Sequence, residues 1–422
     1  MKKKYIIFSI IILVLLITLV TNFNYFKTRN TYVENNSNNQ TKITKGISMN
    51  LEQTAGAGDY KTVTQSGWPT EGYKFNTELS RCENGSELSW DDTKKAVIVL
   101  GNLSDKCYVY FDLIPPITLA EYVISQYTGT QGDNSLYYHD SSLTNGAGDN
   151  SYRYAGANPN NFVCFGSDEA TCPTDNLYRI IGVFGENYHG VSGKQLVKLI
   201  KYDYANSNLL GTDGDYYGSA TPRSSYYKGS LTTINTYYWN YKATGSATNT
   251  WSTSLLNKTN LNTNFINNIG STWANKIATV TWKVGGNTLA NISQSVPATA
   301  YQNEVVNPVT TNTTDNATEY TAKVGLMYVS DYGFGAAPEA WTTRLYSYDG
   351  SVTQNWMHMG AYEWTISRNS ASSTIVFNVE YSGLLNNYYV NSTYNVRPSF
   401  NLVSSVKYVS GSGSMSDPIV LS

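Results

Sequence analysis

The side chains best suited to contact a ligand are tyrosines and asparagines interleaved along YSGLLNNYYVNSTYN, residues 381–395. Tyrosine supplies a large, rigid, amphipathic surface and asparagine supplies adaptable hydrogen bonds, a combination shared by antibody paratopes and sugar-binding sites. The candidate binding residues are Tyr381, Tyr388, Tyr389, Tyr394, Asn386, Asn387 and Asn391. Because the whole chain holds 36 tyrosines, an ordinary polar surface is the alternative interpretation. A second tyrosine-rich stretch, residues 215–241, is another candidate surface.

No catalytic centre is indicated by a local motif. The sequence lacks a Gly-x-Ser-x-Gly elbow, a His-Glu-x-x-His pair and a phosphate-binding loop, so we expect neither enzymatic activity nor a cofactor. The paired carboxylates of a glycosidase need no sequence signature, which leaves a cell-envelope glycosidase or hydrolase as an alternative. Its candidate carboxylates are Glu304, Asp331, Glu339, Glu363 and Glu380.

The four cysteines indicate an oxidising compartment. We expect two local disulfides, Cys82–Cys107 and Cys164–Cys172. A zinc site would need four closely spaced ligands, and the three histidines of the chain lie far apart. We therefore expect no metal site.

The N-terminus predicts a membrane anchor over residues 1–29. Lysines at positions 2–4 precede an uncharged run, residues 5–26, that is long enough to cross a bilayer. The positive-inside rule places the lysines in the cytoplasm and the rest of this single-pass protein outside the cell. A cleaved signal peptide is the alternative, although no Ala-x-Ala-like site follows the run. The chain after residue 29 is net acidic, so we expect no nucleic-acid partner.

Composition and the positions of turn-forming residues divide the remainder of the chain into three parts. A polar, asparagine-rich stalk covers residues 30–44. A small β-sandwich module follows over residues 45–114, and its size makes a disulfide staple reasonable. A large domain covers residues 117–422, after two consecutive prolines.

The large domain is expected to contain two helices and many short strands. Thr118 is a plausible N-cap for the first helix, and the second is expected between Ser252 and Gly270. A hairpin is expected from a strand over residues 177–184 and another over residues 195–202. This mixture predicts the α+β fold class.

The C-terminal segments EWTISR, TIVFNVEYSG and YNVRPSF resemble the tail of bacterial C-type-lectin-like domains, the fold of formylglycine-generating enzymes and of retroelement-diversified receptors. Trp364 and Ser367 match the opening segment, and Val396, Arg397 and Pro398 match the closing strand. Over most of residues 117–422 the chain also resembles a recurrent class of anchored surface proteins of low-GC gut bacteria. The resemblance implies that ligands dock on loops before the closing strand, a surface that would include residues 381–395.

The resemblance also limits the expected chemistry. Formylglycine-generating enzymes need two late cysteines, and this chain has none after Cys172. Calcium-binding lectins use Glu-Pro-Asn and Trp-Asn-Asp patterns, and neither occurs here, so we interpret Asp331 as a turn cap. We expect Arg397 to lock the last core strand through bonds to a carboxylate or to carbonyls, with Pro398 at a strand end. The residues after it should form a hairpin that closes the domain near its start.

Together these observations predict a membrane-anchored, extracytoplasmic binding or adhesion protein that presents a lectin-like domain to a glycan or protein ligand. The envelope glycosidase or hydrolase is one alternative. A purely structural subunit of the cell envelope is the other.

Overall fold

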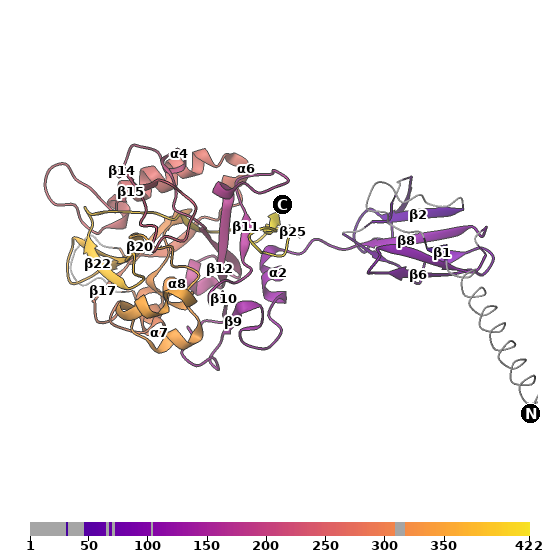
Figure 1. Cartoon of the computed structure of the whole chain (residues 1–422), viewed down its shortest axis with the longest axis horizontal. Coiled ribbons are helices and arrows are strands. Elements are labelled where there is room, and N and C mark those ends of the chain that lie inside the picture. The colour runs from indigo at the N-terminus through magenta and orange to yellow at the C-terminus, as the bar shows by residue number, and fades with distance from the viewer. Residues whose placement is uncertain (1–30, 33–45, 65–66, 70–71, 103, 309–316) are drawn as a thin grey trace, which may run out of the picture. The chain divides into compact units, whose positions relative to one another are not determined.

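The computed structural model describes residues 31–32, 46–64, 67–69, 72–102, 104–308 and 317–422. They fall into two compact units, Met1–Pro116 and Ile117–Ser422, and we describe each by itself (Figure 1). The predicted anchor, residues 1–29, and nearly all of the predicted stalk lie outside the described residues. Within the part of the chain that is described, no helix is long and apolar enough to cross a membrane.

The small unit is built from strands. They are β1 (Thr31–Tyr32), β2 (Ile47–Glu52), β3 (Tyr60–Val63), β4 (Tyr73–Phe75), β5 (Arg81–Cys82), β6 (Glu87–Asp91), β7 (Ala96–Leu100) and β8 (Cys107–Leu113). One sheet has the order β1-β7-β6 and the other β3-β2-β8-β4, with β5 also paired to β8. Strands β2 and β8 are parallel. Strand β1 comes from the segment predicted as a stalk and pairs with β7.

Side chains from both sheets form one core in the small unit. Val97 of β7 packs in the same cluster as Met49 of β2 and Phe111 of β8. The Cys82–Cys107 disulfide joins β5 to β8, which confirms that predicted bridge. Because so small a unit buries little apolar surface, a covalent link across the sheet is a useful addition to its stability.

Strands also dominate the large unit. They are β9 (Leu136–His139), β10 (Ser151–Tyr154), β11 (Phe162–Cys164), β12 (Leu177–Phe184), β13 (Leu196–Lys201), β14 (Tyr216–Ala220), β15 (Ile234–Tyr238), β16 (Val280–Lys283), β17 (Gly286–Asn287), β18 (Glu319–Ala322), β19 (Val324–Gly325), β20 (Glu363–Asn369), β21 (Ile375–Val379), β22 (Leu385–Tyr389), β23 (Thr393–Tyr394), β24 (Ser399–Asn401), β25 (Tyr408–Ser410) and β26 (Val420–Leu421).

A seven-stranded sheet forms the centre of the large unit, in the order β19-β24-β13-β12-β10-β9, with β11 also on β12. All residues of β12 and β13 are buried. Their sequences are accordingly almost continuous apolar runs, interrupted by a few basic residues. Gly182 of β12 follows a bulge in the pairing with β13 and faces β10 on its other side, where an added Cβ would come within 2.2 Å of the Tyr152 carbonyl oxygen. Only glycine fits this close approach of two strands.

Two smaller sheets carry the surface discussed below. One has the order β14-β15-β23, and the other β17-β20-β21-β22. Strands β16 and β18 form a separate pair, as do β25 and β26. The disulfide Cys164–Cys172 is also present, which confirms the second predicted bridge.

The helices of the large unit are short. The α-helices are α2 (Leu119–Ser125), α3 (Glu186–His189), α4 (Ser207–Leu210), α5 (Ile266–Asn268), α6 (Ser271–Ala274), α7 (Pro297–Tyr301) and α8 (Val329–Phe334). The 3-10 and π segments are η1 (Asp133–Ser135), η2 (Thr174–Asn176), η3 (Trp251–Thr253), η4 (Leu256–Phe265), η5 (Gln302–Val306), η6 (Pro338–Thr342) and η7 (Leu345–Gln354). Thr118 caps α2 with a reciprocal capping box, as predicted.

The predicted fold class is wrong. The structure is mostly sheet with few helices, and about 20% of it is helical. Both predicted helical segments are present, as α2 and as η4 followed by α5, but they are short, and strands dominate the described part of the chain. The predicted transmembrane helix lies outside the described residues. The segment after Ser252 starts its main helix only at Leu256, whose N–H donates to Asp215 Oδ2 at 2.8 Å. Ser254 Oγ also accepts from the N–H of Asn257 at 3.2 Å, so Ser254 rather than the predicted Ser252 caps this helix.

The C-terminal hairpin closes the large unit at its beginning, as predicted from its sequence. Strands β25 and β26 pair antiparallel, and the N–H of Leu119 donates to the carbonyl of Val406 at 2.8 Å. The rings of Tyr122 and Tyr408 stack with centroids 3.7 Å apart. The end of the chain therefore has a structural role, because it packs against the first helix of the large unit.

Candidate functional site

A groove of 270 Å³ on the large unit, here called the tyrosine groove, joins the two tyrosine-rich stretches of the sequence. Its lining includes Tyr217, Arg223, Thr236, Tyr362, Tyr381 and Thr393. The first three come from residues 215–241, and the last two from residues 381–395. Two separate candidate surfaces in the sequence are therefore one surface in the structure.

Pairing of strands brings the two stretches together. Strand β15 lies between β14 and β23, with Tyr237 opposite Tyr394 and Tyr238 opposite Thr393. The N–H of Asn395 donates to the carbonyl of Tyr362 at 2.9 Å, so the start of β20 is held beside β23. The groove is thus fixed by backbone hydrogen bonds on both sides.

A series of touching tyrosine rings, here called the ring series, runs from the groove along residues 381–395. The Tyr362 ring lies 5.3 Å from that of Tyr381 and 4.9 Å from that of Tyr394, between centroids. From Tyr394 the series continues to Tyr388 at 6.2 Å and then to Tyr389 at 5.9 Å. Tyr388 and Tyr389 are 50% and 55% exposed, so the series ends in solvent.

Tyr362 of the groove and the adjacent Tyr394 keep their protons at neutral pH. Burial, reinforced by the nearby Glu380 carboxylate, raises the pKa of Tyr362, and burial with the neighbouring Tyr362 raises the pKa of Tyr394. The guanidinium of Arg223 lies over the Tyr381 ring, with Cζ 4.5 Å from its centroid. The groove therefore offers neutral phenol hydroxyls and one cation stacked on an aromatic face.

Hydroxyl groups border the aromatic surface. Ser219, Thr221 and Thr393 line the groove, and within the described parts of the chain their side chains make no hydrogen bond to protein groups. Hydroxyls of this kind can donate to and accept from a ligand. The arrangement can bind a ligand that has an apolar face and several hydroxyls at its edge.

The predicted asparagines contribute less than the tyrosines. Asn386 Nδ2 donates to Glu380 Oε1 at 2.6 Å, and its Oδ1 accepts from the N–H of Asn387 at 2.8 Å, so this amide is used within the protein. Asn391 is exposed on the turn between β22 and β23. Neither residue lines the groove.

The three predicted structural residues lie directly beneath this surface. Trp364 is fully buried, its Nε1 donates to the Tyr237 carbonyl at 2.8 Å, and its ring lies 4.3 Å from that of Tyr394. Arg397 donates from Nε to Glu363 Oε1 at 2.8 Å and from Nη2 to the Met357 carbonyl at 2.6 Å. Pro398 precedes β24 and accepts from the N–H of Lys201 at 3.0 Å.

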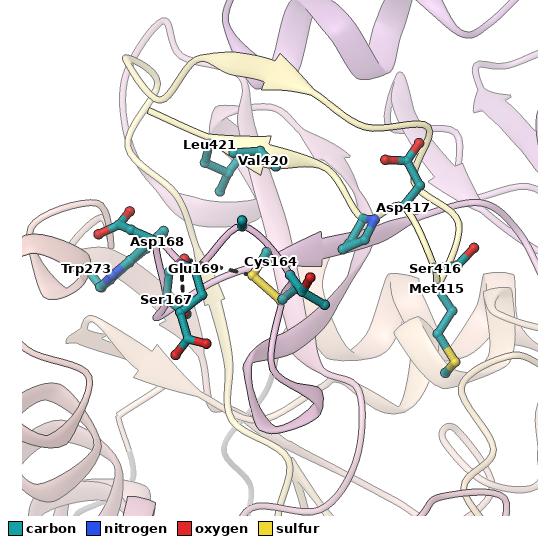
Figure 2. Close-up of a pocket in the computed structure, with 14 residues that line it drawn as sticks. Cys164, Ser167, Asp168, Glu169, Trp273, Met415, Ser416, Asp417, Val420 and Leu421 are labelled. Atoms are coloured by element: carbon teal, nitrogen blue, oxygen red, sulfur yellow. Dashed lines mark hydrogen bonds between the residues drawn. A yellow bond between two sulfur atoms is a disulfide. The ribbon is translucent and has the colours of Figure 1, made fainter. Parts of the chain in front are cut away.

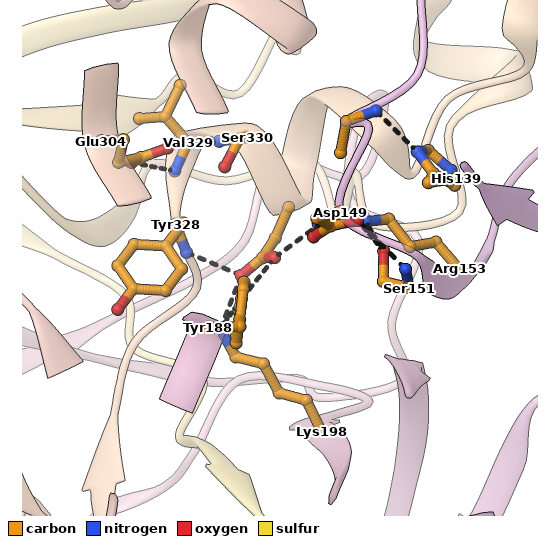
Figure 3. A network of polar contacts seen from close by, with 12 residues as sticks. His139, Asp149, Ser151, Arg153, Tyr188, Lys198, Glu304, Tyr328, Val329 and Ser330 are labelled. Atoms are coloured by element: carbon orange, nitrogen blue, oxygen red, sulfur yellow. Dashed lines mark hydrogen bonds and ion pairs between the residues drawn. The ribbon is translucent and has the colours of Figure 1, made fainter. Parts of the chain in front are cut away.

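Three of the five carboxylates considered for a glycosidase are buried: Glu304, Asp331 and Glu363. Figure 3 shows Glu304 near the polar network of Tyr188 and Lys198. Asp331 accepts from Lys198 Nζ at 2.7 Å and from the Tyr188 hydroxyl at 2.7 Å. Glu304 accepts from the backbone of Val329 and Ser330 at 2.7 and 2.9 Å. Burial raises the pKa of Glu304 to about 7.

None of the five glycosidase candidates lines the tyrosine groove, the pocket beside Cys164, the pocket around Arg179 or the pocket beside Tyr122. Glu363 is buried against Arg397. Glu339 is exposed at the start of η6, and Glu380 holds Asn386. The geometry therefore places no two of them across any of these four pockets.

A second pocket, of 310 Å³, lies beside the Cys164–Cys172 disulfide. Figure 2 shows Asp168 and Glu169 on one side of Cys164 and Asp417 on the other. Both cysteine sulfurs are bonded to each other and cannot ligate a metal. Among the residues that the structure describes, no three His, Cys, Asp or Glu side chains are placed to hold a metal ion.

The sequence did not single out three important residues of the groove: Tyr217, Arg223 and Tyr362. The first two lie within the second candidate stretch, so its tyrosine content was a usable signal. Tyr362 lies outside both stretches and touches Tyr381 and Tyr394 only because β20 and β23 are adjacent. No local pattern could have assigned it.

The structure is thus that of a mostly β protein with two disulfides and an aromatic groove on its surface. No family model, no curated protein and no solved structure matches the chain. The resemblance of the C-terminal segments to C-type-lectin-like domains therefore stays a prediction without support from these comparisons.

Proposed function

We propose that this protein is an extracytoplasmic binding protein that recognises saccharide chains through the tyrosine groove. The observation that carries the proposal is the ring series from Tyr381 through Tyr362 to Tyr394, bordered by hydroxyl groups that form no hydrogen bond to any described part of the protein. Pyranose rings have apolar C–H faces and hydroxyl edges. They match an aromatic platform with hydrogen-bonding groups at its rim.

The disulfides support the proposed location. Structural disulfides persist in oxidising compartments outside the cytoplasm and are rare inside it. Both cysteine pairs of the chain are bonded. A saccharide of a cell surface or of the extracellular matrix is accessible there, which fits a role in adhesion.

A glycan array probed with the purified full-length protein tests the proposal. We expect saturable binding to at least one class of saccharide, and Tyr381→Ala should weaken it at least about tenfold, or about 1.4 kcal/mol. Tyr217→Ala should act in the same direction with little risk to folding, because Tyr217 is 61% exposed. Tyr346→Ala is the matched control, since Tyr346 is 43% exposed and lies on η7, outside the groove.

Saccharides of different length distinguish the contribution of the groove from that of the exposed end of the ring series. Tyr388→Ala with Tyr389→Ala should weaken binding of long chains and leave short ones unaffected, because these exposed rings extend the series beyond the groove lining. Equal binding by Tyr346→Ala and Tyr381→Ala proteins would contradict the groove as the site. Binding to protein ligands alone, or self-assembly without any ligand, would replace the saccharide proposal.

A further inference from the structure

A third pocket of the large unit, here called the cationic pocket, has a volume of 270 Å³. It is lined by Arg179, Lys228 and His358 together with apolar and aromatic side chains, among them Phe162, Trp356 and Met359. No Asp or Glu is among its lining residues. The pocket therefore gathers an arginine, a lysine and a histidine against an apolar wall.

Arg179 is the central cation of this pocket. It is only 4% exposed, and its guanidinium lies between two rings, with Cζ 4.3 Å from the Phe162 centroid and 4.6 Å from that of Trp356. Its hydrogen-bond partners are neutral: Nε donates to Asn161 Oδ1 at 2.7 Å and Nη2 to the Pro159 carbonyl at 2.9 Å. Strand pairing fixes this position, because Arg179 on β12 lies opposite Phe162 on β11.

Other buried arginines show what Arg179 lacks. Arg153 donates to Asp149 Oδ2 at 2.7 Å, and Arg397 to Glu363 Oε1 at 2.8 Å. Among the described residues, Arg179 has no such ion pair. Arg368 also lacks one, but it does not line this pocket. A buried guanidinium without a counter-charge is costly, and an anion that reaches it forms two parallel hydrogen bonds.

Burial and mutual repulsion disfavour the charged forms of the three basic groups in this pocket. Burial lowers the pKa of Arg179 to about 9, with Arg397 acting in the same direction. Burial, then Lys228, lowers the pKa of His358 to about 4, and burial lowers the pKa of Lys228. The cationic form of each group is thus disfavoured in the empty pocket, and a bound anion would favour all three.

We propose that the cationic pocket binds the carboxylate of a small organic acid, with the carboxylate at Arg179 and Lys228 and the apolar part of the acid against Trp356 and Met359. This inference is independent of the saccharide proposal, because it concerns different lining residues. The size of the pocket suits a molecule with about one ring, since drug-sized ligands need about 300–1,000 Å³.

Histidine ring NMR of the full-length protein provides the test, because the chain has only three histidines. Phenylacetate is the probe, and phenylacetamide is its neutral control of the same shape. We expect phenylacetate to shift the His358 ring signals saturably while His139 and His189 stay in place, and phenylacetamide to bind at least about tenfold more weakly. Inorganic phosphate distinguishes a general anion site from one that also needs the apolar wall.

Conservative substitutions of pocket residues test the proposal without unfolding the protein. Lys228→Gln removes an exposed charge and should weaken phenylacetate binding about fivefold, which corresponds to about 1 kcal/mol. Lys242→Gln, at an exposed lysine outside the pocket, should leave it unchanged. Arg179→Lys keeps the charge but loses the planar fork, and should weaken binding more than Lys228→Gln. Four results would each overturn the proposal. The first two are His358 signals that phenylacetate leaves unshifted and equally strong binding of phenylacetamide. The other two are equal effects of the two Gln variants and binding of phosphate alone.

Discussion

The imidazole Nε2 of His358 lies 3.0 Å from the carbonyl oxygen of Tyr381. His358 lines the cationic pocket and Tyr381 lines the tyrosine groove, so a single contact joins the walls of the two sites. Because the partner is a carbonyl oxygen, Nε2 must carry the proton and donate it. His358 is therefore a positioning residue for the groove.

His358→Phe should damage the groove as well as the fold. The substitution leaves the Tyr381 carbonyl without its donor, which should lower the free energy of unfolding by about 1–3 kcal/mol and weaken saccharide binding severalfold. His189→Phe is the matched control, since His189 Nε2 makes the same kind of contact with the Phe184 carbonyl at 3.0 Å, away from the groove. Calorimetric unfolding and saccharide affinity, measured on both variants, separate the two effects. If the His189 variant loses affinity equally, the loss reflects stability alone.

Glu363 and Arg397 should behave as a coupled pair. Both are almost completely buried, with 2.8 Å between Nε and Oε1. Glu363→Leu therefore leaves a buried guanidinium without its counter-charge, and Arg397→Met leaves a buried carboxylate without one. We expect a loss of about 3–5 kcal/mol in the free energy of unfolding for either single change. The double variant Glu363→Leu with Arg397→Met should lose clearly less than the sum, as measured by denaturant unfolding in a double-mutant cycle. Additive losses would show that the two side chains act separately.

The two disulfides should differ in their contribution to stability. Cys82 and Cys107 are 25 residues apart, while Cys164 and Cys172 are 8 apart. Loop-closure entropy then predicts losses of about 3.5 and about 2.5 kcal/mol when each pair is replaced by serine. Denaturant unfolding followed separately for each unit gives the comparison, with the intact second bridge as the internal control. Loss of folding in both units from one pair of substitutions would contradict the independence of the cores.

Glu304 should make the large unit less stable as pH rises. Its pKa is raised from 4.5 to about 7 by burial, so the folded state prefers the protonated carboxyl. This contribution is complete below the unfolded pKa and is lost as pH rises through the folded pKa, a change of about 3 kcal/mol between about pH 5 and pH 8. Unfolding midpoints measured across this range should fall with pH.

Glu304→Gln provides the control for the pH experiment. Both Glu304 oxygens accept from backbone N–H groups of Val329 and Ser330, and an amide can accept with only one of them. The variant should be less stable than the native protein at pH 5 and should lose the slope between about pH 5 and pH 8. A slope that persists in the variant would assign the pH dependence to another group.

Local features were predictable from the sequence because they depend on neighbouring residues. The N-cap at Thr118, the strand over Leu177–Phe184 and its partner Leu196–Lys201 follow from spacing and capping chemistry, and the structure contains all three. Both disulfides were also predictable, because each joins cysteines in the same short segment. Compartment and charge arguments likewise need only composition.

Only the tertiary structure decided the fold class and the sites. The tyrosine groove exists because β15 pairs with β23 and places Tyr237 opposite Tyr394. The cationic pocket exists because Arg179 is buried beside Trp356, far along the chain, without a carboxylate. Which distant segments become neighbours, and which charges lose their water, depends on packing of the whole chain. Neither the pairing of distant segments nor the burial of a charge can be predicted from the spacing of residues along the sequence.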